Sequence, residues 1–320
     1  MGGEIRLARK RFGIGNDMLP YPDMIIGITT MRLDDERESE NIGDRRGDGA
    51  GGGFRIGGGG LGIGGILLVL VVSYFTGFSP STLLGLVPDN GQSTTQSVAS
   101  HKPAANDEMA TFVSKVLADT EDTWQQIFRE SGRQYHDPKL VLFTGSTPTA
   151  CGTGSAAMGP FYCALDQKVY IDLAFYQDLK DRFQAPGDFA EAYVIAHEVG
   201  HHVQNLLGIS GKVHAAQEHA ASEAQANALS VRLELQADCF AGVWGNHADK
   251  MRHIIEPGEI QEALTAASAI GDDRLQQQSR GYVTPETFTH GTSEQRVKWF
   301  TRGIETGDPK QCNTFGKQSL

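Results

Sequence analysis

The spacing of apolar positions divides the chain into a polar N-terminal part and a C-terminal part with helical periodicity. Over residues 107–130 apolar side chains recur mostly three or four positions apart, which predicts an amphipathic helix. The run from Leu140 to Phe143 predicts a buried strand, and residues 161–164 and 169–173 predict a hairpin. The periodicity beyond it is helical almost to the end. We therefore expect an α+β fold that is mainly helical, with a small antiparallel sheet.

One segment before this region is apolar without periodicity. Residues 59–78 contain no charged side chain, and a helix of this length, rising ~1.5 Å per residue, spans the ~30 Å of a bilayer core. A buried core helix is rarely so free of polar residues, and a cleaved signal peptide would lie nearer the N-terminus and end in small residues. The segment therefore predicts one uncleaved transmembrane helix. Its glycines, four positions apart, are a weak indication of a homo-oligomer formed through this Gly-rich helix.

Basic residues predict the orientation of that helix. Arg45, Arg46 and Arg55 precede it, and the first basic residue after it is Lys102. This bias predicts a single-pass protein of the cytoplasmic membrane, in contact with the lipid bilayer, with its N-terminus inside and its large C-terminal domain periplasmic or extracellular.

Composition predicts the remaining boundaries. Residues 1–58 are polar and Gly-rich, which predicts a largely disordered cytoplasmic tail, with residues 1–30 an extension if translation starts at Met31. Residues 79–106 have the composition of a flexible linker, and residues 107–320 form the folded domain. The formal net charge of −11, without a local cluster of Lys and Arg, argues against nucleic acid as a partner.

The strongest chemical pattern is His197-Glu198-Val199-Gly200-His201. Residues four apart lie on one face of a helix, so His197 and His201 can bind one metal ion. Glu198 lies about 100° around the helix from His197 and can accept a proton from water without being a ligand. Two histidines on an ordinary helix are the alternative, but an apolar run precedes them and would bury this helix.

A second pair of acidic residues completes the predicted centre. Glu234 and Asp238 are again four apart among apolar neighbours. Catalytic zinc usually has three protein ligands and one open position. We expect Glu234 to be the third ligand and Asp238 to hold one histidine through its second ring nitrogen. The alternative is a solvated acidic helix face.

These motifs resemble those of known peptidases. The pattern His197-Glu198-x-x-His201 followed by Glu234-x-x-x-Asp238 resembles the gluzincin arrangement. Together with the acidic start at Met31, the Gly-rich apolar segment and the sequence from His290 onward, the chain is similar to the bacterial putative neutral zinc metallopeptidase family. The resemblance implies a zincin-like domain, a Zn²⁺ cofactor and a peptide or protein substrate.

The expected reaction is hydrolysis of peptide bonds by metal-activated water, with Glu198 as general base. For the oxyanion, His290 is the first candidate and Tyr282 and Arg296 follow. The alternative is structural: residues 292–295 look like a capping box, which would make Arg296 a surface residue and His290 a loop residue. Residues 169–173 are the candidate edge strand that pairs with an extended substrate.

Other histidines near the motif are expected to have structural roles. His202 points around the helix from His201, and His214 and His219 lie in a stretch that predicts a solvated helix.

The cysteines agree with an exported domain. Cys151, Cys163, Cys239 and Cys312 allow three pairings. We expect disulfides between Cys151 and Cys163 and between Cys239 and Cys312, in an oxidising compartment. Four buried thiols are the alternative.

Two further functions stay open from the residues alone. A catalytically silent, zinc-stabilised, membrane-anchored binding or regulatory module would keep the fold without turnover. An amidase acting on cell-wall peptides would share the zinc chemistry.

Overall fold

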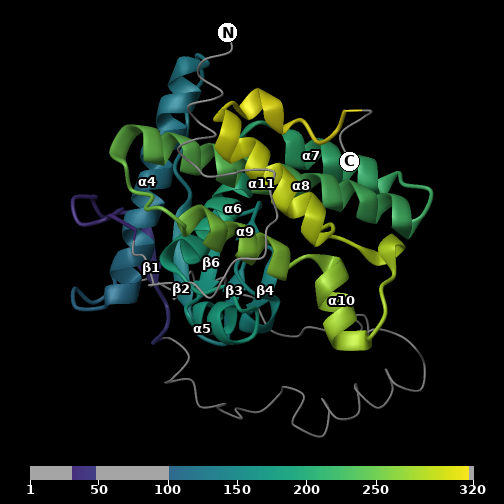
Figure 1. Ribbon diagram of the computed structural model, residues 1–320, viewed down its shortest axis with the longest axis horizontal. Helices are drawn as coiled ribbons and strands as arrows, with labels where there is room; N and C mark the ends of the chain where they lie inside the picture. Colours follow the sequence, from purple (N-terminus) through teal and green to yellow (C-terminus); the bar gives the residue numbers. More distant parts are fainter. Residues whose placement is uncertain (1–30, 48–100, 317–320) are drawn as a thin grey trace, which may run out of the picture. The chain divides into compact units, whose positions relative to one another are not determined.

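The computed structural model describes residues 31–47 and 101–316. Residues 31–46 and 101–316 belong to one compact unit of mainly helical α+β architecture (Figure 1). The strands are β1 (Ile42–Asp44), β2 (Lys139–Phe143), β3 (Ser146–Thr149), β4 (Gly152–Ser155), β5 (Phe161–Cys163) and β6 (Lys168–Asp172). The helices are α4 (Glu108–Glu130), α5 (Ala174–Asp181), α6 (Asp188–Leu206), α7 (Ile209–Glu218), α8 (Glu223–Arg252), α9 (Glu259–Ala269), α10 (Asp272–Arg280) and α11 (Ser293–Thr306), with short 3₁₀ turns η1 (Ala156–Met158), η2 (Pro285–Thr287) and η3 (Pro309–Cys312).

The main sheet is mixed, with strand order β1-β2-β6-β5. β1, β2 and β6 run parallel, and β5 pairs antiparallel with β6 in the hairpin that the sequence predicts. The expectation of a small antiparallel sheet therefore holds only for this hairpin and for the separate β3-β4 pair. Short apolar runs could predict β2, β5 and β6 but neither β1 nor the parallel pairing, because that pairing joins segments far apart in sequence.

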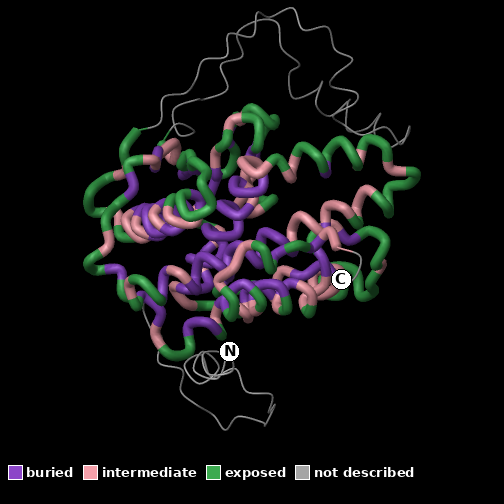
Figure 2. The backbone as a smooth tube through the Cα atoms, turned by 90° about the horizontal axis from the view of Figure 1, so that it is seen from above, coloured by how far each residue is buried: buried purple, intermediate pink, exposed green. Residues whose placement is uncertain are grey.

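Successive side chains of β2 and β6 point to opposite faces of the sheet, and each face packs against a different hydrophobic core. Leu140, Leu142 and Ile171 face the main core, which also contains buried residues of α4, α6, α8 and α11. Val141 and Tyr170 face a smaller cluster with Phe161. Figure 2 shows buried backbone through the middle of the fold and exposed backbone at its periphery.

The predicted helix at 107–130 is present as α4, capped by the Asp107 side chain, which accepts from the backbone N–H of Ala110 at 3.0 Å. The stretch from Ala215 to Leu229, predicted as a solvated helix, is interrupted. α7 ends at Glu218, and α8 begins at Glu223 behind the N-cap Ser222.

Residues 31–46 are part of the folded unit, so the prediction of a solvated tail is wrong for them. Met31 and Leu33 are each 7% exposed and belong to the main core. Ser39 and Asn41 donate hydrogen bonds to the buried Glu121 carboxylate of α4 at 2.6 and 2.9 Å. Composition missed this segment because its few apolar residues are buried by elements that are distant in sequence.

The predicted transmembrane helix at residues 59–78 lies outside the described residues. Within residues 31–47 and 101–316, every helix is too short or too polar to span a bilayer.

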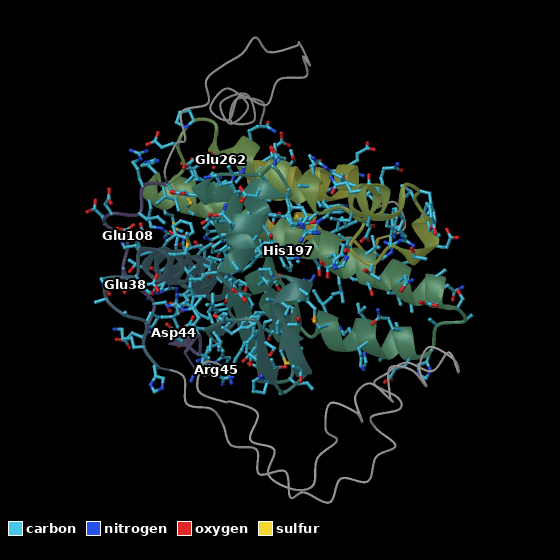
Figure 3. All side chains as sticks on the ribbon, turned by 90° about the horizontal axis from the view of Figure 1, so that it is seen from below. Glu38, Asp44, Arg45, Glu108, His197 and Glu262 are labelled. Carbon is cyan, nitrogen blue, oxygen red and sulfur yellow. A yellow bond between two sulfur atoms is a disulfide. The ribbon has the colours of Figure 1, made fainter. Side chains whose placement is uncertain are left out.

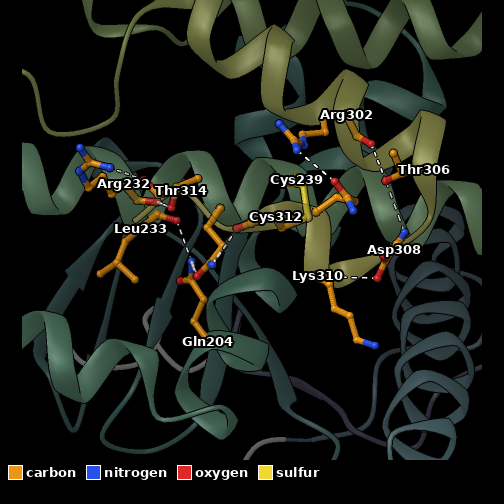
Figure 4. Close-up of a disulfide and its surroundings, with 12 residues drawn as sticks. Gln204, Arg232, Leu233, Cys239, Arg302, Thr306, Asp308, Lys310, Cys312 and Thr314 are labelled. Atoms are coloured by element: carbon orange, nitrogen blue, oxygen red, sulfur yellow. Dashed lines mark hydrogen bonds between the residues drawn. A yellow bond between two sulfur atoms is a disulfide. The ribbon is translucent and has the colours of Figure 1, made fainter. Parts of the chain in front are cut away.

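Both predicted disulfides are present. Cys151 is bonded to Cys163, which ties the β3-β4 hairpin to β5, and Cys239 of α8 is bonded to Cys312 of η3. Figure 4 shows the second bond holding the C-terminal segment against α8.

Candidate metal centre

Helix α6 presents the histidines of the predicted metal site. The helix is almost completely buried, because apolar side chains surround it on nearly all sides. His197 and Glu198 are each 7% exposed. Figure 3 places His197 toward the middle of the molecule, away from surface side chains such as Glu108.

Helix α8 brings the acidic pair to these histidines. α6 and α8 pack closely at Gly200, where a Cβ atom would lie 3.0 Å from the carbonyl oxygen of Ala237. That distance is tighter than most side chains tolerate, so glycine in the motif lets the two backbones approach. Glu234 and Asp238 of α8 therefore lie beside His197 and His201 of α6.

The three predicted ligands converge. One ligand atom from each of His197, His201 and Glu234 lies within 4.8 Å of the others. The Nε2 atoms of His197 and His201 are 3.2 and 3.4 Å from the Glu234 carboxylate oxygens. Two atoms that each lie about 2.1 Å from a tetrahedral zinc ion are about 3.4 Å apart. The spacing of the donors thus fits Zn²⁺.

Asp238 fixes the orientation of His197. Its Oδ1 lies 2.8 Å from Nδ1 of His197, so Nδ1–H donates to the carboxylate and Nε2 is left for a metal. The same carboxylate accepts from the Tyr193 hydroxyl at 2.6 Å and from the Arg296 guanidinium at 2.9 and 3.0 Å. Burial raises the pKa of Asp238, but Arg296 and His197 outweigh it and keep the pKa below its usual value.

Gln204 orients His201 as Asp238 orients His197, and the sequence analysis did not predict this role. Its Oε1 lies 2.9 Å from Nδ1 of His201, and its Nε2 donates to Oε1 of Gln236 at 3.2 Å. Its Nε2 also donates to the Leu233 carbonyl at 2.7 Å (Figure 4). Gln236 in turn donates to the carbonyl of Cys312. Gln204 follows His201 by three residues and so lies on the same helix face, and this spacing was the signal in the sequence for a contact between the two side chains.

Glu198 lies beside the ligands without belonging to the group of donors. Burial is the main influence on its carboxyl group and raises its pKa, against the opposing effect of His197 and His201. A carboxylate with a raised pKa next to a metal site is suited to accept a proton.

The site carries the negative charge that a cation needs. Burial of the imidazole lowers the pKa of His197, but the carboxylates of Asp238 and Glu234 outweigh it and raise the pKa to about 10. The pKa of Glu234 lies well below its usual value, because His201 and His197 outweigh the effect of burial.

His290 lies near this group, on the loop between α10 and α11. Its Nδ1 is 3.1 Å from Oδ1 of Asp272, and Oδ2 of Asp272 accepts from the backbone N–H groups of Thr289, His290 and Gly291 at 2.8, 2.6 and 3.0 Å. The hydrogen bond to Asp272 raises the pKa of His290, and Glu234 adds to the shift. The side chain is half exposed, with Nε2 directed away from its Asp272 partner.

Three other residues considered in the sequence analysis lie outside the donor group. Arg296 is 2% exposed and bound to Asp238, so it is neither an oxyanion donor nor a surface residue. Tyr282 is 60% exposed and contacts Arg280 rather than the ligands. His202 is buried and joins the Tyr162 hydroxyl to the carbonyl of His136.

Two further predictions concern positions around the site. The capping box is present, with Thr292 as N-cap and Gln295 as its partner. The edge strand was predicted at residues 169–173, which is wrong: β6 lies between β2 and β5, and β5 forms the edge of the sheet next to α6.

Comparisons with known proteins agree with this site. The model of the putative neutral zinc metallopeptidase family matches residues 31–315. The uncharacterized protein YpfJ of Escherichia coli (strain K12) is 55% identical over 291 residues, which are 90% of this chain and 99% of the relative. An uncharacterized protein of Mycobacterium tuberculosis (strain ATCC 25618 / H37Rv) is 47% identical over 196 residues, which are 58% of this chain and 65% of the relative. No solved structure matches the chain.

The family match covers both described segments and every residue of the donor group, and the family implies zinc as the cofactor. The chain belongs to the putative neutral zinc metallopeptidase family.

Proposed function

We propose that the protein is a zinc-dependent peptidase whose centre is formed by His197, His201 and Glu234. The observation that carries the proposal is the convergence of these three donors next to Glu198, a buried carboxylate outside the donor group. Among the described residues the group has three members. A catalytic zinc site has three protein ligands and an open position, whereas a structural site closes with a fourth.

The proposed reaction assigns one task to each side chain. Bound zinc supplies Lewis acidity, lowering the pKa of water toward ~7 and polarising a carbonyl group. Glu198 accepts the proton of the attacking water and delivers it to the leaving amine. His290 donates a hydrogen bond from Nε2 to the oxygen that becomes negative, while Asp272 holds the ring.

The proposed substrate is an extended peptide. β5 pairs with β6 on one side, and the described residues place no second strand on the other. β5 is also tied to α6, because the Tyr162 hydroxyl lies 3.0 Å from Nδ1 of His202 and accepts from Asn205 at 3.1 Å. A free strand edge next to the catalytic helix suits main-chain pairing with a peptide.

The two disulfides support a place for this activity in an oxidising compartment outside the cytoplasm. Attachment to a membrane through residues 59–78 stays a prediction from the sequence.

The test separates metal binding from chemistry. Glu198→Gln should keep stoichiometric zinc and lose at least ~10²-fold in peptide hydrolysis, because the general base is gone. His201→Ala should lose zinc. Metal content is measured by atomic emission and hydrolysis by mass spectrometry of a peptide library.

Glu218→Gln, on the exposed face of α7, is the matched control and should leave both quantities unchanged. Wild-type hydrolysis rates in Glu198→Gln would refute the mechanism. The absence of any cleavage product from the zinc-loaded wild type would favour the non-catalytic binding module.

A further inference from the structure

A groove of about 540 Å³ lies between the first three turns of α8 and the loop that joins α10 to α11. Val231 and Phe288 lie at its floor and are 8% and 7% exposed, while Val283 is one of its exposed walls. Ala224, Ala228 and Pro285 complete the apolar lining. The predicted site residues do not include any of these side chains, and a volume of this size is within the range of ligand pockets, ~300–1,000 Å³.

The groove adjoins the metal centre on two elements. Val231 precedes Glu234 by three residues on α8, so the two side chains share a helix face about 4.5 Å apart along the axis. On the loop, His290 lies between two lining residues, Phe288 and Thr292.

Contact between the loop and the helix fixes this arrangement. Gly291 has φ +96°, and a Cβ atom there would lie 3.2 Å from both Val231 and Leu235. The loop backbone therefore rests on side chains of α8 at Val231 and Leu235, on either side of Glu234 in the sequence. The groove and the donor group therefore share helix α8, about one turn apart between Val231 and Glu234.

Charge limits what the groove accepts. Two carboxylates, of Asp273 and Glu286, belong to its lining. Asp273 is held in place because its Oδ1 accepts from the backbone N–H and hydroxyl of Ser293, both at 2.8 Å. Glu286 is exposed, and its backbone carbonyl accepts from Asn227 of α8. A negatively charged group entering here meets like charges next to an apolar floor.

We propose that this groove is a specificity subsite that receives a bulky apolar side chain of the peptide substrate, at one position near the scissile bond, and rejects an acidic one. This inference rests on the proposed peptidase function and adds the class of substrate. The floor of Val231 and Phe288 supplies the apolar contact, and Asp273 with Glu286 supplies the discrimination against carboxylates.

The expected selectivity follows from the size of such contacts. A single methylene in an apolar pocket changes kcat/KM by ~10–200-fold. A peptide library should therefore show one position at which Leu, Met or Phe is preferred over Ala by at least ~10-fold, with Asp and Glu the poorest residues.

The decisive variant fills the groove. Ala228→Trp places an indole on an exposed wall of the groove, so the fold is preserved while the apolar space is occupied. It should reduce kcat/KM for the preferred peptide by at least ~10-fold and leave that for the Ala-substituted peptide nearly unchanged. Ala215→Trp, also at an exposed alanine but on α7 away from the groove, is the control and should retain the wild-type profile.

A second variant tests the charge. Glu286→Lys should raise kcat/KM for the Asp-substituted peptide relative to wild type, because a carboxylate then meets an ammonium group. Unchanged cleavage profiles in both Ala228→Trp and Glu286→Lys, with circular dichroism and zinc content as in the wild type, would overturn the proposal.

Binding separates this inference from the peptidase function. Zinc-loaded Glu198→Gln is titrated with the Leu-, Ala- and Asp-substituted peptides, alone and combined with Ala228→Trp. If the variant binds the Leu peptide preferentially and Ala228→Trp abolishes that preference, the groove is a binding subsite. If the wild type at the same time cleaves no peptide, the proposed peptidase function is refuted while the subsite is retained. If the wild type cleaves peptides without such a preference, the specificity subsite is refuted while the peptidase function is retained.

Discussion

Each histidine of the candidate metal centre has a hydrogen-bond partner at Nδ1, the ring nitrogen that is not part of the donor group. Asp238 holds His197 at 2.8 Å, and Gln204 holds His201 at 2.9 Å. One partner is a buried anion neutralised by Arg296, and the other is a neutral amide that continues through Gln236 to the disulfide segment. The two histidines are thus oriented by networks of different charge.

The neutral network gives a prediction for metal affinity. Gln204→Leu removes the acceptor for Nδ1–H of His201, which should weaken zinc binding by ~10–100-fold, because partners of this kind fix the orientation of the ligand. Zinc affinity is measured by competition with a chromogenic chelator. Gln177→Leu, at an exposed position of α5, is the control. Equal affinity in Gln204→Leu and wild type would contradict the role of Gln204.

His290 gives a prediction for pH dependence. Asp272 raises its pKa, so the imidazole is protonated up to a pH above the ordinary value of 6.5. The cationic donor is therefore present at lower pH and lost as pH rises through the raised pKa. The rate should fall on the alkaline side of that pKa.

His290→Gln should lower kcat by ~10²–10³-fold and remove this alkaline limb from the pH profile of kcat. His214→Gln, at a histidine that is 77% exposed on α7, should leave the limb in place. An unaltered limb in His290→Gln would show that another group titrates.

The spacing of residues predicted the donors but not their surroundings. His197 and His201 are four apart on α6, and Glu234 and Asp238 are four apart on α8, and periodicity alone places each pair on one face of its helix. Arg296 is 58 residues from the Asp238 that it binds. No local pattern distinguishes an arginine that is buried by a distant carboxylate from one that is exposed on an amphipathic helix.

At the scale of elements, the crossing of α8 and α11 positions Arg296 beside Asp238. The two helices touch at Gly242 and Gly303, where a Cβ atom would lie 2.2 Å from the Phe300 carbonyl oxygen and 2.0 Å from that of Cys239. Backbone thus packs directly on backbone at this crossing.

Gly303→Ala should therefore destabilise the protein by ~1–3 kcal/mol, because the added methyl group separates two packed helices. The free energy of unfolding is measured by urea denaturation. Gly211→Ala, where nothing lies within 4 Å, is the control and should be neutral or stabilising by ~0.5–1 kcal/mol. A neutral Gly303→Ala would mean that the helices can shift at no cost.

The order of strands in the main sheet could not be predicted from the sequence. Short apolar runs identified β2, β5 and β6, whereas β1, β3 and β4 were not predicted. These runs gave neither the order nor the edge, since β1 supplies a parallel neighbour to β2 from a segment almost one hundred residues earlier. Pairing depends on which faces the helices cover, and that is decided by tertiary packing.

At the scale of the whole molecule, the fold has two separate pieces of sequence, 31–46 and 101–316. Met31, Leu33 and Ile42 are buried in the main core. Each such side chain contributes ~1.5–3 kcal/mol, and whole domains are stable by only ~5–15 kcal/mol.

A protein that comprises residues 101–320 should therefore unfold at much lower urea concentration than one that comprises 31–320, or fail to fold. Loss of Ser39 and Asn41 also leaves the buried Glu121 without two of its donors. Adding a peptide of residues 31–47 should restore part of the stability. Equal stability of the two proteins would show that the segment is dispensable.

The junction between Asp44 and His101 also restricts membrane topology. Each residue donates its backbone N–H to the carbonyl oxygen of the other, at 2.6 and 3.0 Å. Residues in one folded unit share one side of a membrane, so residues 31–46 and the domain from residue 101 onward lie on the same side of any membrane to which the protein is attached. The prediction that residues 31–46 lie inside while the domain lies outside is wrong, because it would separate β1 from β2.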